Sequence, residues 1–306
     1  MDARLVKLAF KSPVHFGDGR LSDGKYTCDA ATIFSALFIE ALKAGCADDL
    51  LSAARSGDLI LSDAFPYIGD RLYIPKPMVS VEQGRTRADT ADSRARKANK
   101  KLKYMPIDKL DDYLNGSFDF IGELARFENG TSFLRTKVNL MRKTSDDAEP
   151  YHVGGYQFAP GCGIYFLIAG SYDVSSILEP LRYSGIGGKR SSGYGRFNFE
   201  LINGVPFSLV DDCSCKNRSM LLASALPNEG ELADSLLDGA QYRLVHKGGF
   251  VQSASHATTP QKKRDMWVFA PGSMFMNRFR GDVFDVNGTP EAHPVYRYAR
   301  AMWMEV

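Results

Sequence analysis

Residues Gly185 to Gly195 read GIGGKRSSGYG, and the interpretation of the whole chain begins from this stretch. Its five glycines add little to a hydrophobic core, but they permit unusual backbone angles and let a ligand approach the main chain. Between them lie two cations, Lys189 and Arg190, and two hydroxyl donors, Ser191 and Ser192. Backbone N–H groups, cations and hydroxyls directed at one place suit a phosphodiester chain. The alternative is a flexible, solvated turn.

The flanking segments predict the order helix, glycine-rich loop, strand. Asp173 can cap a short helix with apolar residues at helical spacing, namely Val174, Ile177, Leu178 and Leu181. After the loop, apolar and polar residues alternate from Phe197 to Leu201, as in a half-buried strand. A P-loop has the order strand, loop, helix, and its lysine precedes Ser or Thr, whereas Lys189 precedes Arg190. Arg190 also stands where the dinucleotide fingerprint needs its third glycine. The pattern therefore disfavours an NTPase or a nicotinamide enzyme.

Three further stretches of the sequence, taken together with this loop, resemble a known family. They are His15-Phe16-Gly17, the segment from Asp29 to Leu37 that contains Thr32, Phe34, Ser35 and Ala36, and the ending His293-Pro294-Val295-Tyr296-Arg297-Tyr298. The loop resembles that of the RAMP superfamily of CRISPR proteins. Together the four stretches resemble the family of the fourth Csm subunit of type III-A effector complexes. The likeness runs nearly end to end.

Length and composition are consistent with a two-domain α+β protein. The chain has 306 residues and 44% hydrophobic residues, enough for two cores. No apolar run is long enough for a transmembrane helix, and the start lacks a signal-peptide core, so we expect a cytoplasmic protein with no membrane contact. The net charge is only +2, so any RNA-binding charge must be local. Cys213-x-Cys215 is a weak metal signal without further ligands, and we expect no metal and no cofactor.

The first half predicts a ferredoxin-like order of strands and helices. Leu5 to Phe10 is a predicted strand, and Pro13 to Ser22 a glycine-punctuated loop. Asp29 can cap a helix with a broad apolar stripe that ends at Gly45. His15 in the loop could act as a general base for RNA cleavage, as in repeat-processing relatives, or stack on a base, or pack with its neighbour. Because no catalytic partner can be identified, a binding or structural role is favoured.

Two segments of the first half carry clustered positive charge. Arg85 to Lys103 holds eight basic and two acidic residues with almost no large apolar side chain, which predicts a solvated, partly disordered loop that attracts RNA phosphates and orders on binding. Thr131 to Phe158 reads as two strands around a polar tip, a β-hairpin that matches the RAMP thumb in position. Alternation puts Arg135, Lys137 and Asn139 on one face, and Thr136, Val138 and Leu140 on the other. The alternative is an ordinary exposed hairpin.

The second half repeats an αβ alternation. It predicts strands at 220–225, 242–245, 266–269 and 295–298 and a helix at 229–237, which suggests a second, degenerate ferredoxin-like domain. The expected fold class is therefore α+β, with two ferredoxin-like (RRM-like) domains in tandem. The first domain spans 1–205 and carries the basic insertion (about 82–103), the thumb hairpin (about 131–158) and the glycine-rich loop. The second spans 206–306.

The resemblance implies a non-catalytic RNA-binding subunit of a type III-A (Csm) interference complex in antiviral defence. Its implied partners are the guide RNA (crRNA), whose 5′ repeat-derived tag it would hold, the large polymerase-like subunit, the Csm backbone subunit, and target RNA near the tag junction. The expected RNA-binding residues are His15, Phe16, Gly17, Arg135, Lys137, Asn139, Arg142, Gly185, Gly187, Gly188, Lys189, Arg190, Ser191, Ser192, Gly193 and Tyr194. A repeat-processing endoribonuclease that uses His15 and a pure protein scaffold remain the alternatives.

Overall fold

A seven-stranded sheet forms the centre of the molecule in the computed structural model, which describes residues 3–79, 91–139, 149–210, 217–251, 261–288 and 293–306. Its path runs through β11 (Phe197–Asn203), β1 (Ala3–Phe10), β10 (Cys162–Ala169), β5 (Phe65–Ile68), β6 (Arg71–Pro75) and β7 (Tyr104–Pro106), with β4 (Ile60–Leu61) also on β10. Neighbouring strands are antiparallel throughout. Along the chain, β1, helix α1 (Ala30–Ala44), β5, β10, helix α6 (Ser175–Ser184) and β11 follow one another in the order strand, helix, strand, strand, helix, strand.

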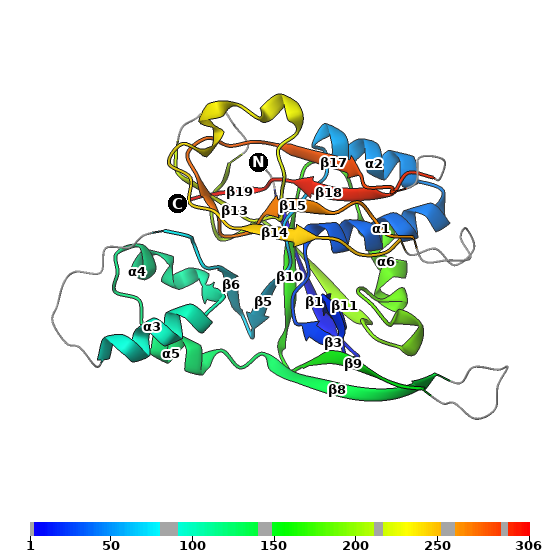
Figure 1. The fold of residues 1–306 in the computed structure, drawn as a ribbon, viewed down its shortest axis with the longest axis horizontal. Helices are drawn as coiled ribbons and strands as arrows, with labels where there is room; N and C mark the ends of the chain where they lie inside the picture. The colour runs from blue at the N-terminus through cyan, green and yellow to red at the C-terminus, as the bar shows by residue number, and fades with distance from the viewer. Residues whose placement is uncertain (1–2, 80–90, 140–148, 211–216, 252–260, 289–292) are drawn as a thin grey trace.

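Local signals set the two helices of this unit. Asp29 accepts a hydrogen bond from the Thr32 backbone N–H and caps α1, and Gly45 ends it with φ 75°, as predicted. α6 begins one residue later than predicted, after Val174, while Asp173 accepts hydrogen bonds from Ser175. α1 and α6 lie together on the right of the sheet in Figure 1.

The main core lies between the sheet and these helices. Every residue of β10 is buried, because the strand is paired on both edges and both of its faces are covered. Phe34 of α1 stacks near Phe38 and contacts Tyr298 of the second half at a centroid distance of 5.4 Å. Burying a side chain of this size contributes about 1.5–3 kcal/mol, so this contact helps join the two halves.

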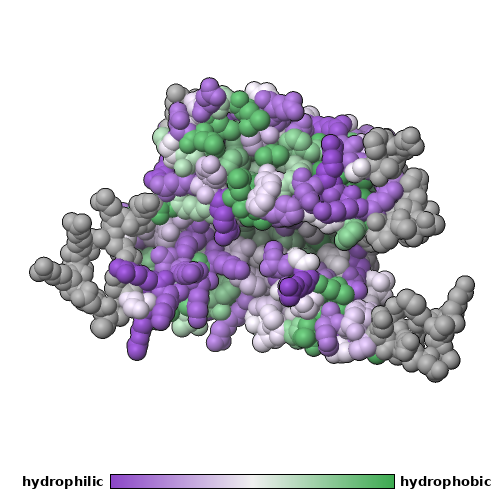
Figure 2. All heavy atoms as spheres, in the orientation of Figure 1, coloured by the Kyte–Doolittle hydropathy of each residue, from purple (hydrophilic) through white to green (hydrophobic). Residues whose placement is uncertain are grey.

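A helical insertion follows β6 on the left of Figure 1, and it changes the prediction for the basic segment. It contains α3 (Ala91–Lys101), α4 (Leu110–Leu114) and α5 (Phe120–Arg126). The loop prediction is wrong for 91–101, because Ala98 and Leu102, four residues apart, are buried and give α3 an inner face. The basic residues of α3 remain exposed, and the surface over α3 and α5 is largely hydrophilic in Figure 2. Residues 80–90 lie outside the described residues.

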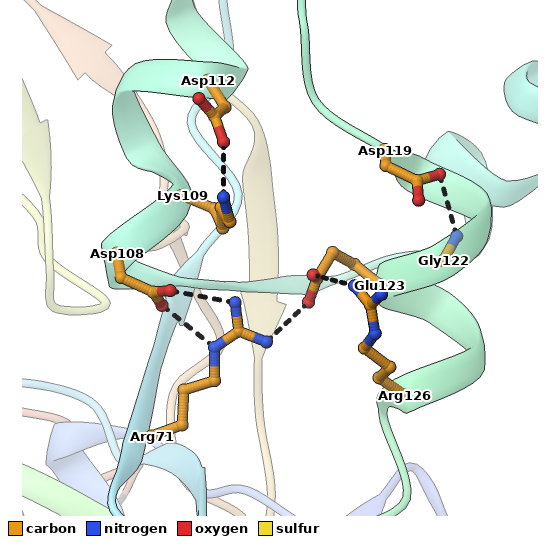
Figure 3. A network of polar contacts seen from close by, with 8 residues as sticks. All are labelled: Arg71, Asp108, Lys109, Asp112, Asp119, Gly122, Glu123 and Arg126. Atoms are coloured by element: carbon orange, nitrogen blue, oxygen red, sulfur yellow. Dashed lines mark hydrogen bonds and ion pairs between the residues drawn. The ribbon is translucent and has the colours of Figure 1, made fainter.

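Arg71 of β6 ties this insertion to the sheet (Figure 3). Its guanidinium donates to both carboxylate oxygens of Asp108 at 3.0 Å and to Glu123 of α5 at 2.9 Å. Glu123 is 3% exposed and also accepts a hydrogen bond from Arg126 at 2.8 Å. The hydrogen bonds from Arg71 lower the pKa of Asp108, and those to Asp108 raise the pKa of Arg71. A buried carboxylate with two cations therefore fixes α5 relative to the sheet.

The second half is built from strands and short turns. Its strands are β12 (Leu209–Val210), β13 (Ser219–Leu221), β14 (Leu244–Lys247), β15 (Met266–Phe269), β16 (Met274–Phe275), β17 (Gly281–Asp285), β18 (Tyr296–Arg300) and β19 (Trp303–Glu305). The predicted helix at 229–237 is wrong, because two 3-10 turns, Glu229–Glu231 and Asp234–Leu237, stand there. Between 206 and 306 the described residues contain no α-helix, so they do not show the predicted αβ alternation.

The segment 13–22 also differs from its prediction. β2 (Phe16–Asp18) and β3 (Arg20–Lys25) form a small antiparallel hairpin with a register shift after Gly17. The glycines, interpreted as loop signals, allow this short turn: Gly19 has φ 93°. Across the described part of the chain, no helix is long and apolar enough to span a bilayer.

Candidate nucleic-acid interface

The predicted hairpin at 131–158 is present as β8 (Gly130–Asn139) and β9 (Glu149–Phe158), each ten residues long. It extends along the bottom edge of the molecule in Figure 1. The register pairs Lys137 with Tyr151 and Phe133 with Gly155. Leu134 and Val138, on the alternate positions, are 59% and 53% exposed. The hairpin thus carries the cations Arg135 and Lys137 on one face and the exposed apolar residues Leu134 and Val138 on the other.

The glycine-rich loop packs directly on the segment after β1. The Gly188 N–H donates to the His15 carbonyl at 2.9 Å, and the Gly195 N–H donates to the Pro13 carbonyl at 2.8 Å. A Cβ at Gly187 would lie 2.8 Å from the His15 carbonyl oxygen, so only glycine fits this close approach. Two of the stretches singled out in the sequence therefore form one surface.

His15 lies at the centre of this surface and is 7% exposed. Its Nδ1–H donates to the Gly154 carbonyl of β9 at 2.6 Å, which fixes the proton on Nδ1. The Val14 backbone pairs with Tyr156 of the same strand. A Cβ on Gly188 would lie 2.7 Å from the Cδ2 atom of the His15 ring. The imidazole therefore joins the hairpin to the glycine-rich loop.

Lys189 has the only positive φ of a non-glycine residue in the described ranges, at 58°. The left-handed conformation costs an ordinary side chain about 1–2 kcal/mol. Strain of this kind concentrates at binding sites, where the surrounding structure holds it. Here a 3-10 turn follows at Arg190–Ser192, and Gly193 ends it with φ 83°. The turn directs the Lys189 ammonium toward the hairpin.

Three cations gather over aromatic rings where loop and hairpin meet. The Lys137 ammonium and the Arg135 guanidinium lie 5.5 and 6.0 Å from the Tyr194 ring centroid. The Lys189 ammonium lies 5.2 Å from the ring of Tyr151. Each contact is worth about 0.5–1 kcal/mol at an exposed site. The rings hold three positive charges side by side without neutralising them, so the charges remain available to an anion. We call Arg135, Lys137 and Lys189 the cation cluster.

The other predicted residues that carry a side chain fall into three groups. Ser191 and Ser192 are exposed beside the cation cluster, and Arg190 is partly buried. Phe16 and Tyr194 are buried, 4% and 2% exposed, so in this structure their rings support the surface instead of facing outward for a base. Asn139 ends β8, and Arg142 lies outside the described residues.

Sequence reasoning missed three residues that organise this site. Phe133 lies 6.4 Å from Tyr194 and 5.5 Å from the Arg135 guanidinium, measured at the ring centroids. Tyr151 supports Lys189, and Gly154 accepts the hydrogen bond from His15. The period-two alternation puts Phe133 on the face of the predicted cations, which was a usable signal. Nothing local marks Gly154, because its role depends on a contact across 139 residues.

Gly188→Ala tests the contact between the loop and His15. The added methyl would lie 2.7 Å from the His15 ring, so we expect the free energy of unfolding to fall by about 1–3 kcal/mol, as in other overpacked sites. In a His15→Ala background the same change should cost almost nothing, because the clash is gone. Urea unfolding of the four proteins measures this coupling.

Gly193→Ala is the matched control for this cycle. Gly193 has φ 83° and no atom within 4 Å of its Cβ position, so alanine there adds only dihedral strain of about 1 kcal/mol. That cost should be the same with or without His15. An equal cost of Gly188→Ala in both backgrounds would contradict the proposed contact.

The groups on this surface are those that bind a phosphodiester backbone. They are cations, hydroxyls and backbone N–H groups, which match phosphate oxygens. Within the described ranges, no three His, Cys, Asp or Glu side chains gather as a metal-ion site, and Cys213 and Cys215 lie outside those ranges.

Family models match almost the whole chain. The RAMP superfamily model matches residues 7–198, and the model for the CRISPR Csm4 C-terminal domain matches residues 214–306. A CRISPR system Csm4 protein of Mycobacterium tuberculosis is 35% identical over 99% of this chain and 98% of its own length. The chain belongs to the Csm4 family.

Other Csm4 relatives agree with this assignment. The Csm4 protein of Streptococcus thermophilus is 34% identical over 100% of this chain and 99% of its own length. The fold is similar to a chain in the crystal structure of a Csm3–Csm4 subcomplex of the type III-A interference complex, with a TM-score of 0.63 at 18% identity, covering 100% of this chain and 99% of that one. A chain of a Csm1–Csm4 cassette in complex with AMPPNP gives 0.63 at 21% identity, covering 100% and 98%.

Proposed function

We propose that this Csm4-family chain is a non-catalytic RNA-binding subunit of a cytoplasmic type III-A complex that acts in antiviral defence. It holds the 5′ repeat-derived tag of the guide RNA and docks the large polymerase-like subunit and the backbone subunit. It also lies near the target RNA at the tag junction. The named assemblies of its structural relatives, Csm3–Csm4 and Csm1–Csm4, support the two protein partners. We further propose that the hairpin acts as a thumb and that 1–205 and 206–306 are separate domains.

The cation cluster is the observation that carries the RNA-binding proposal. Three positive charges converge beside two exposed serine hydroxyls. They come from two segments of the chain, and the nearest members of these in the sequence, Lys137 and Lys189, are 52 residues apart. No carboxylate forms an ion pair with any of the three within the described part of the chain. Like charges held close together repel, and a phosphodiester backbone relieves that repulsion.

The element order of the first half supports a ferredoxin-like domain. Its four strands β11, β1, β10 and β5 have the spatial order 4-1-3-2 when numbered along the chain, with α1 and α6 as the two crossovers. That order is the split βαβ arrangement of ferredoxin-like domains. The glycine-rich loop then lies between the second crossover helix and the last strand.

A salt titration of guide RNA binding tests the proposed function. The slope of log Kd against log salt should be near 0.7 for each phosphate contact on single-stranded RNA, so three contacts predict a slope of about 2. Fluorescence anisotropy with a labelled tag oligonucleotide measures it. A pure scaffold would show no such slope and no binding at low salt.

The same preparation separates binding from cleavage. A nuclease that uses His15 would cut labelled repeat RNA and lose this activity in His15→Ala. We expect no discrete cut, because the ring is 93% covered and its Nδ1–H is already bound to Gly154. A cut that disappears in His15→Ala would replace the binding proposal with a processing nuclease.

A further inference from the structure

A cavity of about 220 Å³ lies between the two halves of the molecule, away from the glycine-rich loop. Its lining combines the end of α2 (Ala47–Ser56), β4 and three segments of the second half. Ser56, Gly57, Arg280 and Arg300 are its polar lining, and Ile60 and Trp303 are among its apolar walls. In Figure 1, α2 and β17 lie in the upper part of the molecule and the β8–β9 hairpin lies at the bottom edge. The cavity is therefore separate from the proposed RNA surface.

Arg300 is the unusual feature of this cavity. It is 6% exposed, and its Nη1 donates to the Arg55 carbonyl at the end of α2. In the described residues no carboxylate pairs with it, and its Nε has no hydrogen-bond partner. A buried guanidinium without a counter-charge is costly, and proteins normally pair such groups. Among the described residues, Arg300 is therefore a buried cation with no anion paired to it.

The surroundings of Arg300 keep room for that anion. Gly57 has φ 99°, and a Cβ there would lie 3.2 Å from Arg300 Nη2, so glycine leaves the guanidinium uncovered on this side. Arg280 is exposed at the cavity and adds a second positive charge. Trp303 donates its indole N–H to the Phe279 carbonyl and so presents an apolar face. The polar groups of the cavity therefore come from the two arginines and the end of α2. Charge and shape together suit an anionic group carried on an apolar support.

We propose that this cavity receives the carboxylate of an Asp or Glu side chain of a partner protein subunit, with an apolar neighbour of that residue on the Trp303 wall. Pockets for nucleotides and other small molecules usually have about 300–1,000 Å³, so 220 Å³ suits one or two side chains. A carboxylate fits the planar guanidinium through two parallel hydrogen bonds. Desolvated anchors of this kind dominate the affinity of protein interfaces. The inference rests on the proposed assembly with other subunits.

Charge reversal at the mouth of the cavity tests the proposal. Full-length Arg280→Glu should bind one of the two partner subunits, the large subunit or the backbone subunit, at least 10-fold more weakly, because like charges then face each other. Arg280→Gln should have a smaller effect, and Arg243→Glu, an exposed reversal outside the cavity, should have none. An acidic partner residue changed to Arg should restore binding to Arg280→Glu. Guide RNA affinity should stay unchanged in all of these, so failure of this inference is distinct from failure of RNA binding.

Arg300→Met distinguishes docking from a structural role. Replacement of an uncompensated buried charge by an apolar chain should leave the Tm of the isolated protein unchanged or raised, while subunit binding falls at least 10-fold. A clear drop in Tm with normal subunit binding would overturn the proposal. The proposal would also be overturned if inorganic phosphate, but not acetate, raised the Tm and this effect depended on Arg300, because the ligand would then be a free phosphate. A third result would overturn it too. If the double variant Asp211→Asn, Asp212→Asn had a lower Tm than wild type, and this loss disappeared in an Arg300→Met background, the chain would be supplying its own carboxylate.

Discussion

Lys247→Met should lower the free energy of unfolding by about 3 kcal/mol at pH 7.5, the largest stability loss that we expect from a single charge in this protein. Lys247 comes from β14, and its ammonium lies 2.7 Å from Asp29, the residue that caps α1. Asp63, 6% exposed, accepts hydrogen bonds from the Ala30 backbone and from Ser224 beside them. Without Lys247, the buried Asp63 and the mostly covered Asp29, whose side chain is 19% exposed, would share this junction, and no other described cation is paired with either carboxylate.

The pKa values of the two carboxylates explain the size of the effect. Burial alone would raise the pKa of Asp29, but the charge of Lys247 and its hydrogen bond bring it below the ordinary value. Burial, and then the charge of Asp29, raise the pKa of Asp63 to about 6. Burial lowers the pKa of Lys247, but the charges of Asp29 and Asp63 and the hydrogen bond to Asp29 together outweigh it, so the net shift is upward. The cation therefore stabilises a pair of acids that would otherwise repel each other.

The sign of the pH dependence follows from these shifts. Asp63 is protonated more readily in the folded state than in the unfolded state, so its contribution to stability decreases as the pH rises from about 4 to 6. Asp29 contributes stability above its unfolded pKa, which is lost as the pH falls below about 4. In Lys247→Met the repulsion grows with the ionisation of Asp63. The loss should therefore be smaller at pH 5 than at pH 7.5.

Urea unfolding at these two pH values measures the effect, and Lys262→Met is the matched control. Lys262 pairs with Asp265 at 2.9 Å, but the two side chains are 64% and 39% exposed, so the loss should stay below about 1 kcal/mol at either pH. Equal losses in the two variants would show that the junction between the halves does not depend on Lys247.

Features with local signals could be predicted from the sequence. Asp29 and Gly45 mark the ends of α1, the glycines mark the loop between α6 and β11, and alternation marks the β8–β9 hairpin. The helix α3 was missed because, among the side chains described there, only Ala98 and Leu102, the residue that follows the helix, are buried, too few for a helical stripe. The 3-10 turns at 229–237 were missed because a short polar segment with acidic residues has the composition of a helix start.

The contacts that assemble the site could not be predicted in this way. The Gly154 carbonyl that orients His15 and the Ser224 groups that bind Asp63 are reached across 139 and 161 residues. Composition and spacing carry no information about such distances. The sequence identified most residues of the surface, but which of them face outward depends on packing. Tyr194 shows this, because a tyrosine expected at the RNA is 2% exposed and lies beneath two cations.

Removal of the cation cluster should weaken guide RNA binding about 100-fold at low salt. The variant combines Arg135→Gln, Lys137→Gln and Lys189→Asn, with Asn at 189 because it tolerates the left-handed backbone there. Three phosphate contacts at about 1 kcal/mol each give about 3 kcal/mol, or two orders of magnitude. The salt slope should fall by about 2. The loss should be the same for every tag sequence, because phosphates carry no base identity.

Removal of three charges from α3 separates contact from general attraction. Arg94→Gln, Lys97→Gln and Lys101→Gln change the net charge by the same amount on an exposed helix. Attraction at a distance is screened within about 10 Å at 0.1 M salt, so this variant should lose affinity mainly at low salt and approach wild type as the salt rises. The cation-cluster variant should remain weaker than wild type up to a higher salt concentration than the α3 variant does, because its hydrogen bonds to RNA are gone. If both variants followed the same salt curve, the cation cluster would add only general charge, and the tag would have to be held elsewhere on the chain.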